Sequence, residues 1–242
     1  MPSIKELHYQ FKLNMDRVDS LNGPDFKVGQ IDWLLNEAQL IFVKQRMSMY
    51  SNPKQKGFEQ SQKRIDDLGA LVIKFPAQPA VTPISVASNI YEVPFTGLSY
   101  NYLFLISVWV DAEIKPGCVK SIPLRFIQHD DYRSSLKDPF FEAGEEFIPY
   151  NIGRASSSEN EAMYIYCDFP INKVYLEYIK YPARVSYGNY KYIDGNTYPE
   201  QSLQTSPQTN AEIVDIACTL AGLSAQNPEY IQLKATKLSI HE

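Results

Sequence analysis

The spacing of apolar residues changes along this chain, and that change constrains the fold more than any other feature. Between Ile4 and Val18 apolar residues recur every three or four positions, which is the period of an α-helix that buries one side. From Leu71 the spacing becomes two, the period of a β-strand. After Pro207 the helical spacing returns. We therefore expect helices at both ends of the chain and a sheet between them.

Three helices are predicted before the period changes. The first covers about 4–18 with Ser3 as its N-cap, and the third covers about 59–68. The second, over about 28–49, has apolar residues on one face (Ile31, Leu34, Leu35, Ala38, Phe42) and on another (Trp33, Leu40, Val43). A helix that is apolar on two sides needs neighbours on both.

The central region predicts an antiparallel sheet. Strands are expected at about 71–75, 91–95, 101–111, 121–126, 163–169 and 174–178. In the longest of them Tyr102, Phe104, Ile106, Val108 and Val110 are predicted to point one way, and Leu103, Leu105 and Trp109 the other. Turn residues between the strands favour a sandwich or a barrel-like sheet.

The predicted fold class is therefore α+β. A helical subdomain made by both termini, residues 1–70 and 203–242, carries an inserted antiparallel β-sandwich-like module, residues 71–202, which includes a tyrosine-rich loop. Ser206 and Pro207 predict the start of a C-terminal helix, and Asn227-Pro228 either starts another helix or kinks the same one.

Composition limits the functional classes. The chain is 44% hydrophobic and 21% charged, which is the ordinary range of a globular protein. Three widely spaced cysteines favour reduced thiols, and no apolar run is long enough to span a bilayer. The opening MPSIKELHYQF lacks the layout of a signal peptide, so assembly in a cytoplasm is expected.

Charge is concentrated in one segment. Residues 128–161 hold eight acidic and three basic residues, which accounts for the net charge of −5 of the whole chain. The segment is interpreted either as a solvated loop region or as a negative surface that repels passing DNA or receives a basic partner. Glu145 and Glu146 are the residues singled out for that surface.

Catalytic and metal-binding patterns are not found. The three histidines, His8, His129 and His241, are isolated in sequence, and His129-Asp130-Asp131 cannot direct three adjacent side chains at one ion. Glu145 and Glu146 would point to opposite faces of a strand, which does not suit a carboxylate pair for glycoside hydrolysis. We therefore expect no catalytic residue, metal or cofactor, and no enzymatic activity.

Five segments together resemble the head–tail connector, or ring, proteins of crAss-like phages. The segments are IKELHYQFKLNMDRVDS, FKVGQIDWLLNEAQLIFVKQR, FEQSQKRIDDLGALV, YKYIDGNTYPEQS and NAEIVDIACTLAGLSAQNPEYIQLKATKL. The resemblance covers both helical ends, and the central region only in general character. The stretch from Gln204 to Thr209 is neutral, whereas the family often has a longer acidic or histidine-containing approach to its last helix.

This resemblance implies a structural protein of the virion, located at the interface of head and tail. Such proteins are similar to adaptor rings of short-tailed phages, which dock below the portal and extend the DNA channel. The implied partners are further copies of the chain, twelve to a ring, the portal protein, other tail ring proteins, and genomic DNA that passes without sequence-specific binding. No membrane partner is expected. The interaction residues selected are Trp33, Phe42, Tyr190, Tyr192, Tyr198, Glu145, Glu146 and Tyr230.

Two other functional classes remain open. The chain has 17 tyrosines, and aromatic side chains also suit a β-sandwich module that binds carbohydrate. A coplanar set of exposed rings, which Tyr187, Tyr190, Tyr192 and Tyr198 are candidates to form, would favour that class. A hydrolase is the weaker alternative, because no nucleophile, base and orienting residue can be named.

Overall fold

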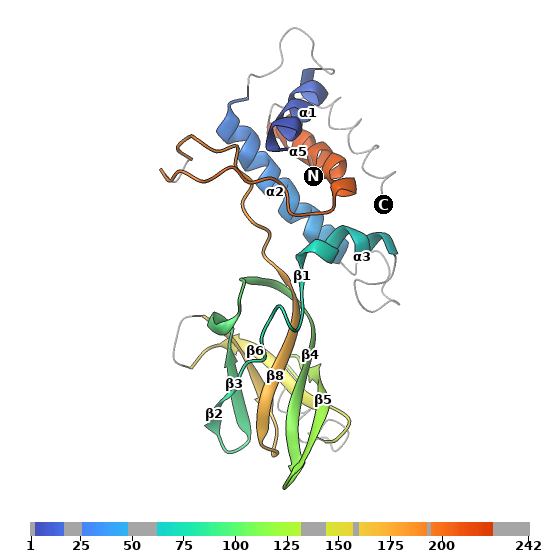
Figure 1. Ribbon diagram of the computed structural model, residues 1–242, viewed down its shortest axis with the longest axis vertical. Coiled ribbons are helices and arrows are strands. Elements are labelled where there is room, and N and C mark those ends of the chain that lie inside the picture. The colour runs from blue at the N-terminus through green and yellow to red at the C-terminus, as the bar shows by residue number, and fades with distance from the viewer. Residues whose placement is uncertain are drawn as a thin grey trace. The chain divides into compact units, whose positions relative to one another are not determined.

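The computed structural model describes residues 3–16, 26–47, 62–131, 144–156, 160–192 and 195–224 of the 242. These residues form a mixed α/β protein with four α-helices and one curled, mostly antiparallel sheet of eight strands (Figure 1). The chain divides into two compact units. The helical unit comprises Met1–Leu71 and Pro182–Glu242, and the β unit comprises Val72–Tyr181.

The tyrosine-rich loop belongs to the helical unit, which corrects the predicted boundary at 202. Residues 182–202 group with the helices, and the backbone N–H of Tyr187 donates a hydrogen bond to Asp32 on the second helix. The loop was assigned to the β module because it follows the predicted strands directly in the sequence. Its actual partner is a side chain that lies 155 positions earlier in the chain.

The helices of the helical unit are α1 (Ile4–Asp16), α2 (Val28–Met47), α3 (Gln62–Leu68) and α5 (Asn210–Ser224). Ser3 begins α1 with a capping box, in which its hydroxyl accepts a bond from the Glu6 N–H and its own N–H donates to the Glu6 carboxylate. A 3-10 helix, Pro207–Thr209, precedes α5 and follows Ser206, which makes no side-chain cap bond. The proposed helix after Asn227 lies outside the described residues.

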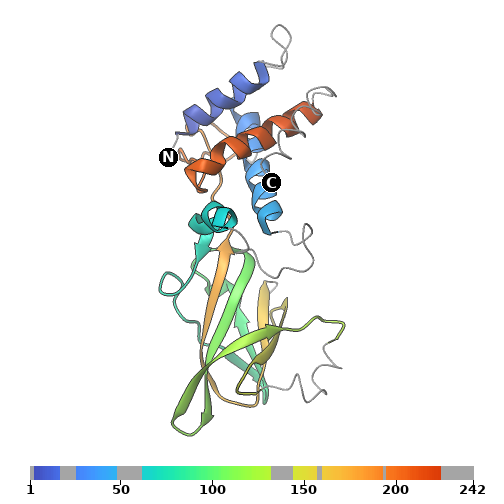
Figure 2. The ribbon, with the colours of Figure 1, turned by 90° about the vertical axis from the view of Figure 1, so that its right-hand side faces the viewer.

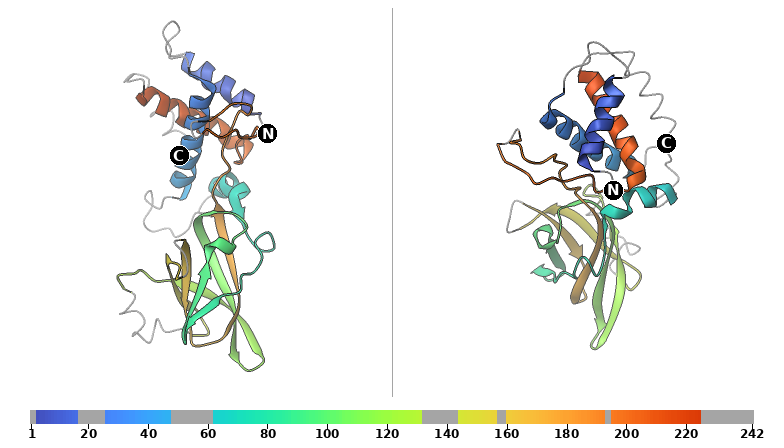
Figure 3. Two further views of the ribbon diagram at one scale, coloured as in Figure 1. Left: turned by 90° about the vertical axis from the view of Figure 1, so that its left-hand side faces the viewer. Right: turned by 45° about the horizontal axis from the view of Figure 1, so that its top comes forward.

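The core of the helical unit lies between α1, α2 and α5, and α1 and α5 lie side by side (Figure 3). It consists of fully buried apolar residues from all three helices: Leu7, Phe11, Ile31, Leu35, Phe42, Ile213, Ala217 and Ala221. The main apolar stripes of the first two helices therefore do form a core, whereas Trp33, on the second predicted face of α2, is exposed. Small residues on α5 permit the close approach of its neighbours, and the Cys218 thiol lies 3.9 Å from the carbonyl oxygen of Phe11.

The strands of the β unit are β1 (Val72–Ile73), β2 (Ile84–Ala87), β3 (Ile90–Pro94), β4 (Tyr102–Lys115), β5 (Cys118–Phe126), β6 (Ile148–Arg154), β7 (Glu161–Tyr166) and β8 (Ile171–Lys180). They are ordered β1-β8-β4-β5-β6-β7-β3-β2 in the sheet. β5 and β6 pair in parallel, and the other neighbours are antiparallel. Figure 2 shows the long strands β4 and β8 side by side.

The two halves of the curled sheet share one apolar core. It contains buried residues from β3 to β8, among them Val93, Val108, Val110, Ile122, Ile148, Ile165, Val174, Leu176 and Tyr178. The outer side of the sheet keeps larger half-buried rings. Trp109 on β4 and Tyr175 on β8 are register partners, and their rings stack at 5.5 Å between centroids.

The predicted alternation along β4 is wrong in its first half. Register shifts occur between Tyr102 and Phe104 and between Leu105 and Ser107. Each shift adds a residue to one strand of the pair, which reverses the side to which the following residues point. Consequently Leu105 and Val108 both pack against the core, although they are three positions apart.

Two strands were not predicted from the sequence. All four residues of β2 are exposed, so neither face of this strand is buried. Burial therefore imposes no alternation on its residues, and the sequence pattern does not predict the strand. β6 lies inside the acidic segment 128–161, and its residue Ile148 is fully buried in the β core. The segment is therefore not a continuous solvated surface.

The β unit starts and ends on adjacent strands. Val72 and Ile73 of β1 pair with Ile179 and Tyr178 of β8, near the two points at which the chain passes from one unit to the other.

Candidate functional site

The histidines in the described part of the chain make structural contacts. His8 Nε2 lies 2.7 Å from Asp32 Oδ1, and His129 Nε2 lies 2.6 Å from the carbonyl oxygen of Ile152. His129, Asp130 and Asp131 are exposed. Among the described residues no group of three or more His, Cys, Asp or Glu side chains could hold a metal ion.

Asp32 is the centre of a buried polar cluster in the helical unit. Its side chain on α2 is fully buried and contacts three donors: His8 of α1, the Tyr187 N–H at 2.8 Å, and the Tyr190 hydroxyl. A buried carboxylate is expensive unless such partners compensate for its lost hydration. Burial, followed by the bond to Asp32, raises the pKa of Tyr190, so its phenol stays a donor. The cluster fixes the tyrosine-rich loop to two helices.

The loop also contacts α2 through its backbone and its rings. The Asn36 side chain exchanges two hydrogen bonds with the backbone of Val185, at 2.8 and 2.9 Å. Gly29 permits the close approach of the Tyr190 ring, because a Cβ there would lie 3.3 Å from Tyr190 Cε2. These contacts hold the loop against α2 over more than one helical turn.

Three of the interaction residues selected from the sequence, Tyr190, Tyr192 and Tyr198, meet in this loop, and two of them contact one cation. The Arg184 guanidinium carbon lies 3.6 Å from the ring centroid of Tyr192 and 4.4 Å from that of Tyr198. Tyr190 and Tyr192 are inclined at 46°, and Tyr192 and Tyr198 at 88°. Tyr192 is buried, so these rings do not form the coplanar exposed set that sugar binding by this loop requires.

An ionic cluster joins α2, α3 and α5. Arg46 contacts Asp67 at 3.0 Å and Glu212 at 2.5 Å, and Lys63 contacts Glu212 at 3.1 Å. Burial raises the pKa of Asp67, although the charge of Arg46 opposes that rise. Removal of Arg46 would leave the carboxylates of Asp67 and Glu212 near one another without the cation between them. Arg46 therefore has a structural role.

The outer faces of α1 and α2 expose large apolar side chains. Trp33 is 48% exposed and stands about 200° around the helix from the buried Ile31. On α1, Tyr9 is 69% exposed and Leu13 is 40% exposed, one helical turn apart. The helical unit therefore presents apolar surface on two helices, on the sides that face away from its core.

The other selected residues have different surroundings. Phe42 is fully buried, so its selection as an interaction residue is corrected: its ring packs in the helical core and beneath the Arg46 guanidinium. Glu145 and Glu146 are exposed, and Glu145 lies 3.2 Å from Lys120. Tyr230 lies outside the described residues.

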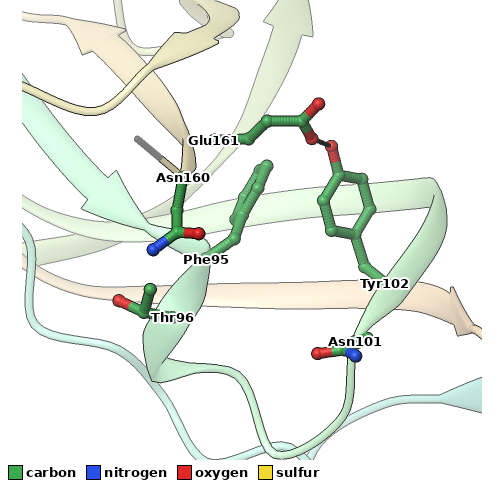
Figure 4. Close-up of a pocket in the computed structure, with 6 residues that line it drawn as sticks. All are labelled: Phe95, Thr96, Asn101, Tyr102, Asn160 and Glu161. Atoms are coloured by element: carbon green, nitrogen blue, oxygen red, sulfur yellow. Dashed lines mark hydrogen bonds between the residues drawn. The ribbon is translucent and has the colours of Figure 1, made fainter. Parts of the chain in front are cut away.

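A pocket of about 360 Å³ lies in the β unit (Figure 4). It is lined by residues of the 3-10 helix after β3, the start of β4 and the start of β7: Phe95, Thr96, Asn101, Tyr102, Asn160 and Glu161. The Tyr102 hydroxyl donates a hydrogen bond to Glu161, and the rings of Phe95 and Tyr102 lie 4.4 Å apart at 57°. Burial, then the bond to Glu161, raises the pKa of Tyr102.

Sequence reasoning missed this pocket and the polar clusters around Asp32 and Arg46. Asp32 and Arg46 fitted the ends of an ordinary solvated helix, as charges that complement its dipole. A signal was nevertheless present, since both residues fall close to the apolar stripe of α2 rather than opposite to it. The pocket residues come from three separate segments, and no spacing rule connects them.

Comparison with known proteins gives no assignment: no protein-family model matches this chain, and no curated protein matches it. Within the described residues, no helix combines the length and the apolar character needed to cross a membrane.

Proposed function

We propose that this chain is a non-enzymatic structural protein of a phage virion, which forms a ring between the portal and the tail. Copies associate head to tail around the DNA channel, twelve to a ring, next to the portal and to other tail ring proteins. The proposal includes the finer fold expected from the sequence, in which both termini complete the helical subdomain and the curled sheet is its inserted sandwich-like module.

The apolar surface on the outer faces of α1 and α2 is the observation that carries this proposal. A head-to-tail ring needs two different patches on each subunit, one for each neighbour. Trp33 on α2 and the pair Tyr9 and Leu13 on α1 supply one candidate for each patch. Tryptophan and tyrosine are also the residue types that most often dominate the energy of protein interfaces.

The anchored tyrosine-rich loop supports the same proposal. Binding costs less free energy when a surface is already ordered, because fewer side chains lose freedom on association. The bonds of Asp32 and Asn36 order residues 185–190 within a single subunit. We infer that the loop presents a fixed surface to a neighbouring subunit or to the portal.

The test is the oligomeric state of the purified full chain, alone and mixed with its candidate portal. Light scattering and negative-stain electron microscopy should show a ring of about twelve copies. Trp33→Glu places a charge at the proposed contact and should weaken association by about 2 kcal/mol, which is roughly 30-fold. Gln45→Glu adds the same charge at an exposed position of the same helix and should leave the ring intact.

The proposal fails if the chain remains a monomer both alone and with the portal. It also fails if Trp33→Glu and Gln45→Glu have equal effects on a ring that does form. Circular dichroism of both variants serves as the folding control, since neither position lies in the helical core.

Carbohydrate binding through the tyrosine-rich loop is not favoured by the geometry of that loop. The rings of Tyr190, Tyr192 and Tyr198 are inclined to one another, and the face of Tyr192 is taken by Arg184. The chemistry expected of a carbohydrate site instead occurs in the β unit, in the pocket between Phe95 and Glu161.

A further inference from the structure

The size of the β-unit pocket fits a small ligand. Its volume of about 360 Å³ is near the lower end of the range for small-molecule sites, roughly 300–1,000 Å³. Three separate elements converge on it, so its shape depends on the folded β unit rather than on one loop. A site of this size suits one or two sugar rings.

The lining combines two aromatic rings with a border of polar groups (Figure 4). Phe95 and Tyr102 provide a surface against which the C–H face of a sugar can pack. Asn101, Asn160 and Thr96 carry groups that both donate and accept hydrogen bonds. A sugar hydroxyl does both as well, so the border matches a polyol better than it matches an apolar ligand.

Charge indicates which sugars the pocket would accept. Among the six described residues that line it, Glu161 is the only carboxylic acid, and none is Lys, Arg or His. A carboxylate in this position repels phosphate, uronate and sialate groups. The Tyr102 hydroxyl bonds to one oxygen of Glu161 and holds the carboxylate at the edge of the pocket as a hydrogen-bond acceptor.

We propose that this pocket binds a neutral saccharide, with Phe95 as the stacking surface and with Asn101, Asn160 and Glu161 as the hydrogen-bonding partners. The inference is independent of ring assembly, because the six described residues that line the pocket belong to one β unit. A ring protein of a virion and a monomeric binding protein could both carry the site.

The test uses the full chain in two steps. A glycan array with neutral and acidic members gives the class, and saturation-transfer NMR then measures methyl glycosides of glucose, mannose and galactose, and N-acetylglucosamine. Glucuronate, sialic acid and choline are the charged comparisons. We expect a neutral saccharide to bind with a Kd of about 1 mM, typical of a shallow site with few contacts.

Variants locate the binding. Asn101→Ala removes one polar partner at an exposed position and should weaken binding about tenfold, while Phe95→Ala should abolish it. Tyr100→Ala removes an exposed tyrosine next in sequence to Asn101 but outside the lining, and should leave the Kd unchanged. If Phe95→Ala fails to fold, the comparison of Asn101→Ala with Tyr100→Ala decides.

Three results would overturn the inference: no neutral saccharide binds, Asn101→Ala binds as well as Tyr100→Ala, or a charged probe binds in preference to every neutral sugar. A preference for choline would mean that the pocket, through its two rings and Glu161, binds a cation and not a sugar.

Discussion

Replacement of Asp32 by alanine should release the tyrosine-rich loop from the helices. The change removes the acceptor of three hydrogen bonds, from His8, from the Tyr187 N–H and from the Tyr190 hydroxyl. A hydrogen bond to a charged group contributes about 1.5–3 kcal/mol, and such contributions are not additive within one cluster. We therefore expect the free energy of loop opening to fall by about 3–5 kcal/mol, a large fraction of the stability of a typical domain.

Hydrogen exchange measured by mass spectrometry resolves this effect by segment. Peptides that cover 182–192 should exchange about 150- to 5,000-fold faster in Asp32→Ala than in the wild-type chain, which is the same loss of 3–5 kcal/mol expressed as a rate ratio. Peptides of β4 should be unchanged, since they belong to the other unit. Asp32→Asn keeps the shape and one acceptor oxygen, so it should have a smaller effect, about 1–2 kcal/mol.

Glu37→Ala is the matched control, because it removes a carboxylate from the same helix at a half-buried position. Tyr190→Phe tests one bond of the cluster by itself, and its effect should largely disappear in the Asp32→Ala background. Exchange in 182–192 that stays within threefold of wild type in Asp32→Ala would refute the view that this carboxylate anchors the loop.

Two further predictions concern the three cysteines and the exposed acidic pair of the β unit. At pH 8 iodoacetamide should alkylate Cys118 well before Cys167 and Cys218, because Cys118 is exposed and the others are buried. Burial also raises the pKa of the Cys167 thiol to about 11, which leaves little reactive thiolate at that pH; equal alkylation in peptide mass spectra would contradict this. In phage particles, reversal of both Glu145 and Glu146 to lysine should lower the infectious yield if the acidic surface keeps DNA moving. The unfolding midpoint should hardly change, since an exposed ion pair contributes less than about 1 kcal/mol, and an unaltered yield would remove the assignment.

The sequence predicted the elements whose burial is periodic. α1 and α2 were predicted because their core residues repeat at helical spacing, and β8 because apolar residues that face the core alternate with other residues from Val174 to Tyr178. β5 was predicted from the same alternation in sequence, although only Ile122 is buried there and Phe126 is exposed. β2 was missed because all its residues are exposed, and β6 because surrounding acids suggested a solvated segment. The periodicity argument needs one covered face, and β2 does not have one.

The candidate sites depend on contacts that a single sequence does not reveal. Arg46 meets Glu212 across 166 positions, and Asn36 meets Val185 across 149. Only the packing of the helices and of the tyrosine-rich loop brings these groups together, so no local pattern predicts them. Trp33 is the exception, because the sequence alone shows that it lies on a second apolar face, away from the main apolar stripe of its helix.

The pairing of β1 with β8 has a consequence for how the helical unit is assembled. About 110 residues separate its two parts, and closing a flexible loop of that length costs roughly 4 kcal/mol in entropy. Once β1 and β8 pair, the ends of the intervening polypeptide are neighbours about 5 Å apart. Folding of the β unit therefore already supplies most of the loop-closure entropy that assembly of the helical unit would otherwise cost. The helices can then join as if a short turn connected them. A chain in which such a turn replaces Val72–Tyr181 should therefore be a viable starting point for a minimal helical protein.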